Sequence, residues 1–190
     1  MSDRERLLAV AAGLFARQGY HGTDIADVAK AAGLGRDALH RHVESKEALL
    51  YTISRARVDH VTGQAAAALG AGHPPEDLLR TLARGLLRDV ADHRAEWAVF
   101  LREHPALTGD RQADVLAAHE RYADQWRQAL DRGVAAGVLR EAPAALVPGV
   151  VGMLSHPALW DAPADPDALA DAYLDALLGG LRATRPASAP

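Results

Sequence analysis

The sequence predicts an all-α protein of about nine helices, and three observations support this fold class. Apolar residues recur at three- and four-residue spacing through most of the chain, which is the period of a helix with one buried face. Glycine and proline clusters interrupt this pattern, and no stretch alternates polar and apolar residues as a strand does. A chain of 190 residues with 49% hydrophobic residues can bury a core and form one or two small domains.

The first predicted helix covers residues 3–18 and ends at Gly19, because glycine readily adopts the left-handed backbone conformation of a helix end. Its buried face is expected to contain Leu7, Val10, Ala11, Leu14 and Phe15.

Residues 22–50 predict two short helices joined by a glycine turn. Thr23 is the expected N-cap of the first short helix, and Gly33 is expected to end it. The second is expected over residues 36–42, and Ser45 can cap the long helix that follows. This arrangement is a helix-turn-helix, a motif whose second helix enters the DNA major groove. The expected inward residues are Ile25, Val28, Ala29, Leu34, Leu39 and Val43.

The remaining helices are expected over residues 45–70, 75–93, 95–103, 108–136, 143–155 and 165–181. The first of these stops at the cluster from Gly70 to Pro75, which a helix cannot cross. We expect a helix-turn-helix DNA-binding domain over residues 1–50 and a ligand-binding and dimerisation domain over residues 51–183. Residues 184–190 are expected to form a flexible tail. The inward residues of the helix over 75–93 are expected to be Leu78, Leu79, Leu82, Leu86 and Val90.

A second signal lies in the order of residues between Arg4 and Ile53. This region contains AAGLFARQGYHGTDIADVAKAAGL, followed by Leu39, His42 and the run Lys46-Glu47-Ala48-Leu49. With these residues it resembles the N-terminal domain of TetR-family transcriptional regulators. The resemblance implies a homodimeric, ligand-responsive repressor that reads a palindromic operator in double-stranded DNA. The expected DNA-binding residues are Thr23, Gly35, Arg36, Asp37, Ala38, His40, Arg41, His42 and Lys46.

The recognition helix departs from the family pattern. Where the family has a tyrosine followed two residues later by histidine and then phenylalanine, this chain has His40, His42 and Val43. Asp37 would repel phosphate, although it can accept a hydrogen bond from a cytosine amino group. We therefore expect an unusual operator. The alternative is a helical ligand-binding or scaffold protein whose head no longer reads DNA.

The charge of the chain bounds the strength of DNA binding. The net charge is −4, and residues 1–50 carry seven Lys or Arg residues against seven Asp or Glu residues. Because few basic residues are available to neutralise phosphates, we expect a dimer to be needed for useful affinity.

The last two predicted helices have apolar faces that suit self-association. By resemblance to the family, these helices from two protomers form a four-helix interface. The other interpretation is that both faces belong to the core of a single protomer. The residues are Leu146, Val147, Val150, Val151 and Leu154, with Gly149 and Gly152 allowing close approach, and Leu169, Ala172, Tyr173, Ala176, Leu177, Gly180 and Leu181.

The middle of the chain offers apolar and aromatic residues for a small-molecule site, since pockets between the helices of a bundle suit small apolar ligands. The segments HRAEWAVFLREHPAL, DRGVAAGVLRE and LADAYLDALLGGL resemble a TetR subgroup that senses acyl-CoA thioesters. Aromatic residues at helical spacing are also typical of an ordinary core, so that interpretation stays open. The expected ligand-binding residues are Leu86, Val90, Trp97, Phe100, Leu101, Tyr122, Trp126 and Met153.

The sequence lacks the motifs of several other functional classes. The chain has no cysteine, which excludes disulfides and thiolate sites and suits a reducing cytoplasm. No two of its nine histidines have the spacing of a helix-borne metal site, and no nucleophile elbow or phosphate-binding loop is present. We expect no signal peptide and no membrane span, because a span needs about 18 consecutive apolar residues. We therefore expect a cytoplasmic protein that is not an enzyme and that has no metal and no cofactor.

Overall fold

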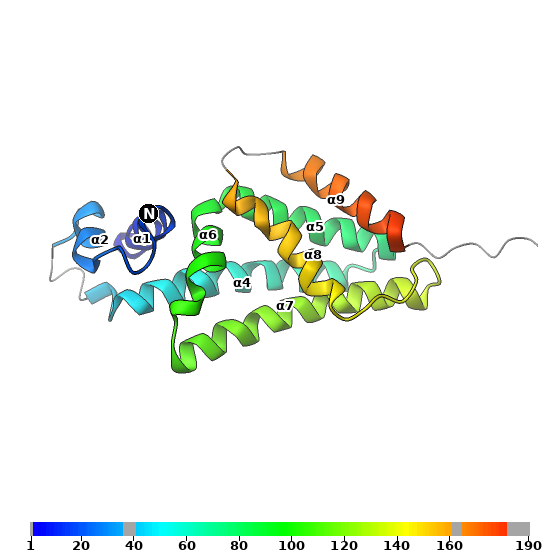
Figure 1. Cartoon of the computed structure of the whole chain (residues 1–190), viewed down its shortest axis with the longest axis horizontal. Helices are drawn as coiled ribbons and strands as arrows, with labels where there is room; N and C mark the ends of the chain where they lie inside the picture. Colours follow the sequence, from blue (N-terminus) through cyan, green and yellow to red (C-terminus); the bar gives the residue numbers. More distant parts are fainter. Residues whose placement is uncertain (1, 36–40, 161–164, 182–190) are drawn as a thin grey trace, which may run out of the picture. The chain divides into compact units, whose positions relative to one another are not determined.

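The computed structural model describes residues 2–35, 41–160 and 165–181. These residues form eight α-helices and two short 3₁₀ helices and contain no β-strand, which confirms the all-α prediction (Figure 1). No helix in these three ranges is long and apolar enough to span a membrane. The helices are α1 (Asp3–Gln18), α2 (Ile25–Ala31), α4 (Lys46–Gly70), α5 (Pro75–Asp92), α6 (Arg94–Glu103), α7 (Gly109–Ala135), α8 (Leu146–Ser155) and α9 (Pro166–Leu181), with 3₁₀ helices η1 (His104–Ala106) and η2 (His156–Leu159).

The chain divides into two compact units. The first consists of Met1–His60 and Asp92–Glu120, and the second of Val61–Ala91 and Arg121–Pro190. Helices α4 and α7 each contribute residues to both units. The first unit therefore contains α6 and the start of α7 in addition to residues 1–50, which the sequence sets apart as the DNA-binding domain.

Helix α1 forms over the residues that its apolar pattern predicts. Ser2 and Glu5 make a reciprocal capping box at its start, and Gly19 ends it with a positive φ of 77°. Arg6 donates from Nε to the carbonyl oxygen of Ala32 at 2.9 Å, which ties α1 to the end of α2. The buried residues of α1 are Leu7, Ala11, Ala12 and Phe15.

Helix α2 begins one residue later than its predicted cap. Asp24, and not Thr23, is the N-cap, because the Asp24 carboxylate accepts from the backbone nitrogen of Ala26 at 3.1 Å. Gly33, with a φ of 70°, follows the helix as predicted. Arg41 and His42 are helical, whereas residues 36–40, which hold most of the predicted recognition helix, lie outside the described residues.

Helix α4 begins at Lys46 behind a Ser45 cap, as predicted. The Ser45 hydroxyl accepts from the backbone nitrogen of Ala48 at 3.0 Å. In the first unit, the start of α7 also contacts the first half of α4. The Tyr51 hydroxyl of α4 donates to the Asp114 carboxylate of α7 at 2.7 Å, and Arg55 Nε lies 3.0 Å from the same carboxylate oxygen. These contacts fix the first half of α4 against the first turns of α7.

The second unit is built around α5, whose apolar stripe is buried at each predicted position from Leu78 to Val90. Two side chains of α7 donate to carbonyl oxygens of α4: Gln125 to Thr62 at 3.1 Å and Arg132 to Leu69 at 2.7 Å. The second of these satisfies a carbonyl in the last turn of α4, where no intrahelical donor is available.

A ladder of ion pairs joins α5 to α9. Arg80, Arg84 and Arg88 lie at four-residue spacing on α5, and Asp175, Asp171 and Asp167 lie at the same spacing, in reverse order, on α9. The two helices are therefore antiparallel, as Figure 1 also shows. Exposed ion pairs of this kind add little net stability because water screens them, but three in succession fix the register of the two helices.

Candidate functional site

Lys46, at the first position of α4, contacts the loop that connects α1 to α2. Its ammonium nitrogen donates to the carbonyl oxygens of Tyr20 and Thr23, each at 2.9 Å, and lies 4.4 Å from the centre of the Tyr20 ring. These contacts lie inside the first unit and engage two of the three ammonium donors. The structure thus gives Lys46 a positioning role within the first unit, and the DNA contact expected of it from the sequence stays a prediction.

Thr23 is also directed inward. Its side chain is 2% exposed, and its hydroxyl donates to the Gly19 carbonyl oxygen at 2.9 Å. The hydroxyl is thus engaged within the first unit, and the expectation that Thr23 binds DNA stays a prediction. The burial follows from the helix start at Asp24, which turns the preceding residue into the unit.

The other expected DNA-binding residues divide into two groups. Gly35 and Arg41 are exposed and His42 is half-buried, so these positions remain available to a ligand outside the unit. Arg36, Asp37, Ala38 and His40 lie outside the described residues. Their DNA contacts stay a prediction.

Glu47, next to Lys46, receives hydrogen bonds from the start of α7. The backbone nitrogen and the hydroxyl of Thr108 each donate to its Oε1 at 2.9 Å, and Arg111 donates to its Oε2 at 3.2 Å. The backbone hydrogen bond from Thr108, followed by the Thr108 hydroxyl, lowers the pKa of this carboxyl. Lys46 and Glu47 therefore link α4 to two other segments of the first unit.

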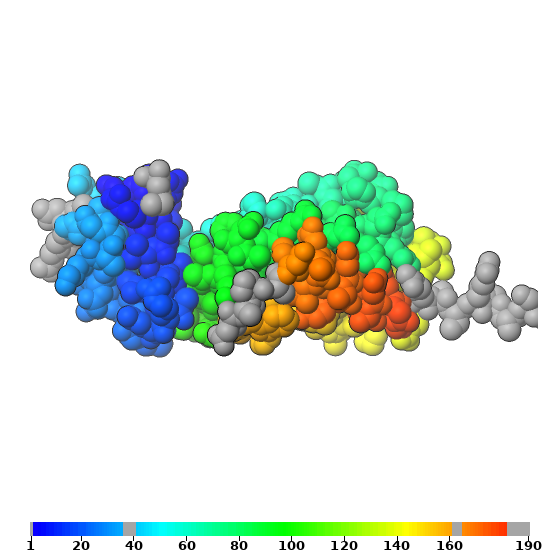
Figure 2. Space-filling view, turned by 90° about the horizontal axis from the view of Figure 1, so that it is seen from above, coloured from blue at the N-terminus to red at the C-terminus, as the bar shows by residue number. Residues whose placement is uncertain are grey.

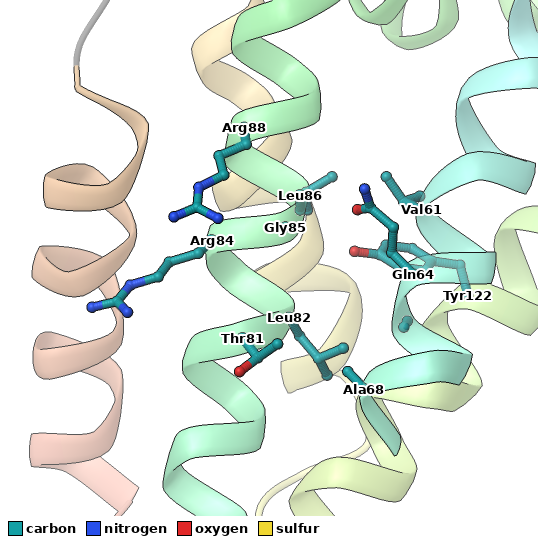
Figure 3. A pocket seen from close by; sticks show the side chains of 11 residues that line it. Val61, Gln64, Ala68, Thr81, Leu82, Arg84, Gly85, Leu86, Arg88 and Tyr122 are labelled. Atoms are coloured by element: carbon teal, nitrogen blue, oxygen red, sulfur yellow. The ribbon is translucent and has the colours of Figure 1, made fainter. Parts of the chain in front are cut away.

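A pocket of about 320 Å³ lies in the second unit between α4 and α5 (Figure 3). Its volume is at the lower end of the range for small-molecule sites. Helix α7 contributes Tyr122, which is 2% exposed, and burial raises the pKa of its hydroxyl well above the ordinary value. The lining residues are Val61, Gln64, Ala65 and Ala68 of α4, Thr81, Leu82, Arg84, Gly85, Leu86 and Arg88 of α5, and Tyr122.

Only Leu86 and Tyr122 of the expected ligand-binding residues line this pocket. Val90 and Trp126 are 2% and 1% exposed and belong to the core of the second unit, where Met153 is half-buried. Trp97, Phe100 and Leu101 belong to the first unit, where the Trp97 and Phe100 rings meet edge to face at 5.7 Å. Trp97 and Phe100 are core residues of the first unit, at 2% and 5% exposed, whereas Leu101 is half-buried.

The polar half of this pocket was not predicted from the sequence. Gln64, Arg84 and Arg88 have the pattern of a solvated helix face, and the side chain of Gln64 passes close to the backbone of Gly85. A Cβ added at Gly85 would lie 3.3 Å from Oε1 of Gln64. The glycine inside an otherwise amphipathic helix is the signal that could have indicated a close approach here.

A second cavity of about 420 Å³ lies in the second unit beside the end of α7 and the segment that leads to α8. It is larger than the pocket between α4 and α5, but its lining contains none of the expected ligand-binding residues. Four of its lining residues are charged: Arg127, Asp131, Arg140 and Glu141. Among the described residues, no group of histidine, aspartate and glutamate side chains could hold a metal ion.

Helices α8 and α9 bury one face each within the second unit. On α8 the buried residues include Val147, Val150, Val151 and Leu154, so most of the face predicted for dimerisation is intramolecular core. On α9 the buried residues are Ala170, Leu174, Leu178 and Leu181. The remaining predicted α9 residues, Leu169, Ala172, Tyr173, Ala176, Leu177 and Gly180, are exposed or half-buried.

Two protein-family models match this chain. Residues 7–52 match a model described as bacterial regulatory proteins of the tetR family, and residues 72–181 match one described as a tetracyclin repressor-like C-terminal domain. The chain belongs to the TetR family. The N-terminal match covers the helix-turn-helix, and the C-terminal match covers α5 to α9. The chain is therefore a DNA-binding transcriptional regulator of this family.

Curated relatives and solved structures agree with this assignment. The transcriptional repressor KstR2 of Mycolicibacterium smegmatis is 28% identical over 140 residues, which are 73% of this chain and 68% of that protein. The TetR-family regulator PfmR of Thermus thermophilus is 31% identical, with a TM-score of 0.85 over 92% of this chain and 97% of PfmR. AibR, solved in complex with isovaleryl coenzyme A and operator DNA, shares the fold at 24% identity, with a TM-score of 0.79 over 95% of this chain and 98% of AibR.

Proposed function

We propose that this TetR-family protein is a homodimeric repressor that leaves a palindromic operator when an acyl-CoA-type or other small apolar effector binds between α4 and α5. One observation carries the proposal. Helix α4 holds the loop after α1 through Lys46 at its first residue, and about four to six turns later it lines the pocket through Val61, Gln64, Ala65 and Ala68. The same helix therefore contacts the loop between α1 and α2 and lines the pocket proposed for the effector.

The operator follows from the symmetry of a dimer. Each protomer places one recognition helix in the major groove of one half-site, and the half-sites lie about 34–36 Å apart or at a multiple of that distance. A small displacement of α4 changes the distance between the two recognition helices and prevents both from binding at once. By linkage, an effector that releases DNA binds the DNA-bound protein more weakly than the free protein.

The proposed dimer interface consists of the faces of α8 and α9 that the protomer leaves uncovered. Figure 2 shows α9, in orange to red, at the surface of the second unit. On α8, Gly149 and Gly152 are exposed, and a Cβ added at either would meet nothing within 4 Å. Packing within the protomer therefore does not require glycine at these positions. The close approach of a partner helix would require it.

The effector class rests on the pocket and on the relatives. The lining combines apolar residues such as Leu82 and Leu86 with the buried hydroxyl-bearing ring of Tyr122, which suits an acyl chain. AibR, which shares the fold, binds isovaleryl coenzyme A, and KstR2 is a repressor. These relatives support a repressor with an acyl-CoA effector in this chain.

The proposal is tested by selecting binding sites from random duplex DNA at low salt and then titrating the selected operator with octanoyl-CoA. We expect a palindrome to be enriched, and we expect octanoyl-CoA, but not coenzyme A alone, to weaken DNA binding by about 5–150-fold. Selection without any enriched palindrome, together with octanoyl-CoA binding, would support a ligand-binding protein that no longer reads DNA. A palindrome with no response to octanoyl-CoA would contradict the proposed effector class.

A further inference from the structure

Arg84 and Arg88 belong to two structural features at once. Both line the pocket between α4 and α5, and both form ion pairs with α9. Figure 3 shows their guanidinium groups extending from α5 toward α9, on the side of α5 away from Val61 and Gln64. The stems of these side chains thus form an edge of the pocket while their charged ends are held by aspartates.

The two pairs have the geometry of anion recognition. Arg84 Nη2 donates to both Asp171 carboxylate oxygens, at 2.8 and 2.7 Å, and its Nε donates to one of them at 3.1 Å. Arg88 donates from Nε and Nη2 to the two Asp167 oxygens at 2.6 and 2.5 Å. A guanidinium binds carboxylate and phosphate oxygens with this same two-pronged geometry, so either anion can replace the aspartate.

The pocket itself has room for only part of a large effector. At about 320 Å³ it suits an apolar chain, and the charged group of such a molecule would stay outside. A charged group at the edge formed by α5 comes within reach of Arg84 and Arg88 when their side chains rotate from α9 toward the pocket. Few other cations are available there, since these are the only Lys or Arg residues among the lining residues described for this pocket.

Exchange of the aspartates for another anion costs little. Arg88 and Asp167 side chains are 59% and 42% exposed, and those of Arg84 and Asp171 are 41% and 37% exposed. Water therefore screens the existing pairs, and long exposed arginine side chains can rotate between neighbouring acceptors. In the absence of effector, the aspartates hold both guanidinium groups on the α9 side of α5.

We propose that Arg84 and Arg88 form an anion subsite of the effector pocket and that the anionic group of the effector displaces Asp171 and Asp167 from them. The inference rests on the proposed function, because it requires that the pocket between α4 and α5 hold the effector. It adds the chemistry of the ligand: an apolar chain that ends in a carboxylate or in phosphates. Displacement leaves Arg80 with Asp175 as the remaining rung of the ladder between α5 and α9.

The binding test compares three ligands that share one acyl chain. Octanoyl-CoA carries phosphates, octanoate carries a carboxylate, and S-octanoyl-N-acetylcysteamine carries the thioester without any charge. Binding to the full-length chain is measured by calorimetry, with melting curves to show that each variant is folded. We expect at least one of the two charged ligands, octanoyl-CoA or octanoate, to bind at least about tenfold more tightly than the uncharged thioester.

Three variants separate the subsite from the ladder. The R84Q/R88Q double variant is expected to lose about tenfold or more in affinity for the charged ligand and to keep its affinity for the uncharged thioester. R80Q is the matched control, because Arg80 pairs with Asp175 and Asp171 but does not line the pocket. The D167N/D171N double variant frees both arginines and is expected to bind the charged ligand several-fold more tightly than the wild type.

Each contrary result has one meaning. Equal losses in R84Q/R88Q and R80Q, or no gain in D167N/D171N, overturn the anion subsite. If the uncharged thioester binds as tightly as both charged ligands, the subsite is overturned while the effector pocket stands. If none of the three ligands binds, the proposed effector class fails. In that case inorganic pyrophosphate tests the subsite on its own. The subsite stands if pyrophosphate binds the wild type and R80Q but not R84Q/R88Q, and it is overturned otherwise.

Discussion

The ammonium of Lys46 lies over the ring of Tyr20, 4.4 Å from its centre, and donates to the carbonyl oxygen of the same residue at 2.9 Å. Tyr20 is itself buried against Phe15, with the two rings edge to face at 5.5 Å. Lys46 therefore connects the first turn of α4 to the core of the helix-turn-helix unit. A substitution of Lys46 removes contacts with Tyr20 and Thr23 inside the first unit, whatever its effect on DNA binding.

Lys46→Ala is expected to destabilise the chain by about 1–3 kcal/mol, because two carbonyl oxygens lose a charged donor. Lys30→Ala, at an exposed lysine near the end of α2, is the control and should leave the stability unchanged. Denaturant unfolding measures both. DNA binding of Lys46→Ala should keep the salt dependence of the wild type, and a slope smaller in magnitude by about 1 would restore the phosphate contact as its main role.

Leu177→Arg is expected to dissociate the dimer and leave the protomer folded. Leu177 is half-buried on the uncovered face of α9, whereas the next residue, Leu178, is 0% exposed in the core. Leu178→Arg should instead unfold the second unit, since it buries an unpaired charge. Sedimentation and circular dichroism of the two variants distinguish these results. An intact Leu177→Arg dimer would remove this face from the interface.

Gly85→Leu is expected to fill the pocket and weaken octanoyl-CoA binding by about tenfold or more, while operator binding stays near that of the wild type. The atom nearest to a Cβ added at Gly85 is Oε1 of Gln64, at the flexible end of its side chain, which can move aside. Gly63→Leu is the control, because Gly63 lies on α4 in open space and does not line the pocket. Equal effects of the two variants on octanoyl-CoA binding would argue against this pocket.

Gly133→Ala is expected to destabilise the chain by about 1–3 kcal/mol. A Cβ at this position in α7 would overlap Leu139, whose Cγ lies 2.7 Å from it and whose side chain is 3% exposed. Gly63→Ala meets no atom within 4 Å and should stabilise α4 by about 0.5–1 kcal/mol. Thermal melting of both variants should therefore move in opposite directions.

Stability is expected to fall as the pH drops below about 6.5, the ordinary pKa of histidine. Burial, and then the charge of His104, lowers the pKa of His119, whose ring lies 5.7 Å from that of Phe100. The folded chain therefore binds a proton at His119 less readily than the unfolded chain does, and the stabilisation present above pH 6.5 is lost as the pH falls through the folded pKa.

His119→Gln should flatten this dependence, measured as melting temperature between pH 7.5 and 5. His73→Gln is the control, since His73 is exposed in the turn after α4. A variant at His119 with the same slope as the wild type would place the pH dependence elsewhere.

The helices could be predicted because each is defined by a local pattern. Apolar spacing, together with the terminal glycine of α1, predicted α1 and α5 to within one residue, and the predicted Ser45 cap is present. The cap of α2 was missed because Thr23 and Asp24 are both good caps and stand side by side. In the structure the Thr23 hydroxyl donates to the nearby Gly19 carbonyl oxygen, which leaves Asp24 to cap the helix.

The pocket could not be predicted to the same degree. Helical spacing shows that Trp126 and Tyr122 are buried, but it does not show whether a buried side chain faces a neighbour or a cavity. That distinction depends on how α4 and α5 pack, which no single-helix pattern contains. The ladder did leave a signal, since Arg80, Arg84 and Arg88 share the four-residue spacing of Asp167, Asp171 and Asp175.

The ladder also determines which changes in length α5 and α9 can accept. Arg80 and Arg88 are eight residues apart, as are Asp167 and Asp175, so the rungs on the two helices match in number and spacing. One residue inserted between Arg80 and Arg88 would turn every later position of α5 by about 100° and separate Arg88 from Asp167. Exchanging both charges of a rung, as in Arg88→Asp with Asp167→Arg, keeps the match. These two helices can therefore diverge by paired substitution, whereas an insertion in one requires a compensating insertion in the other.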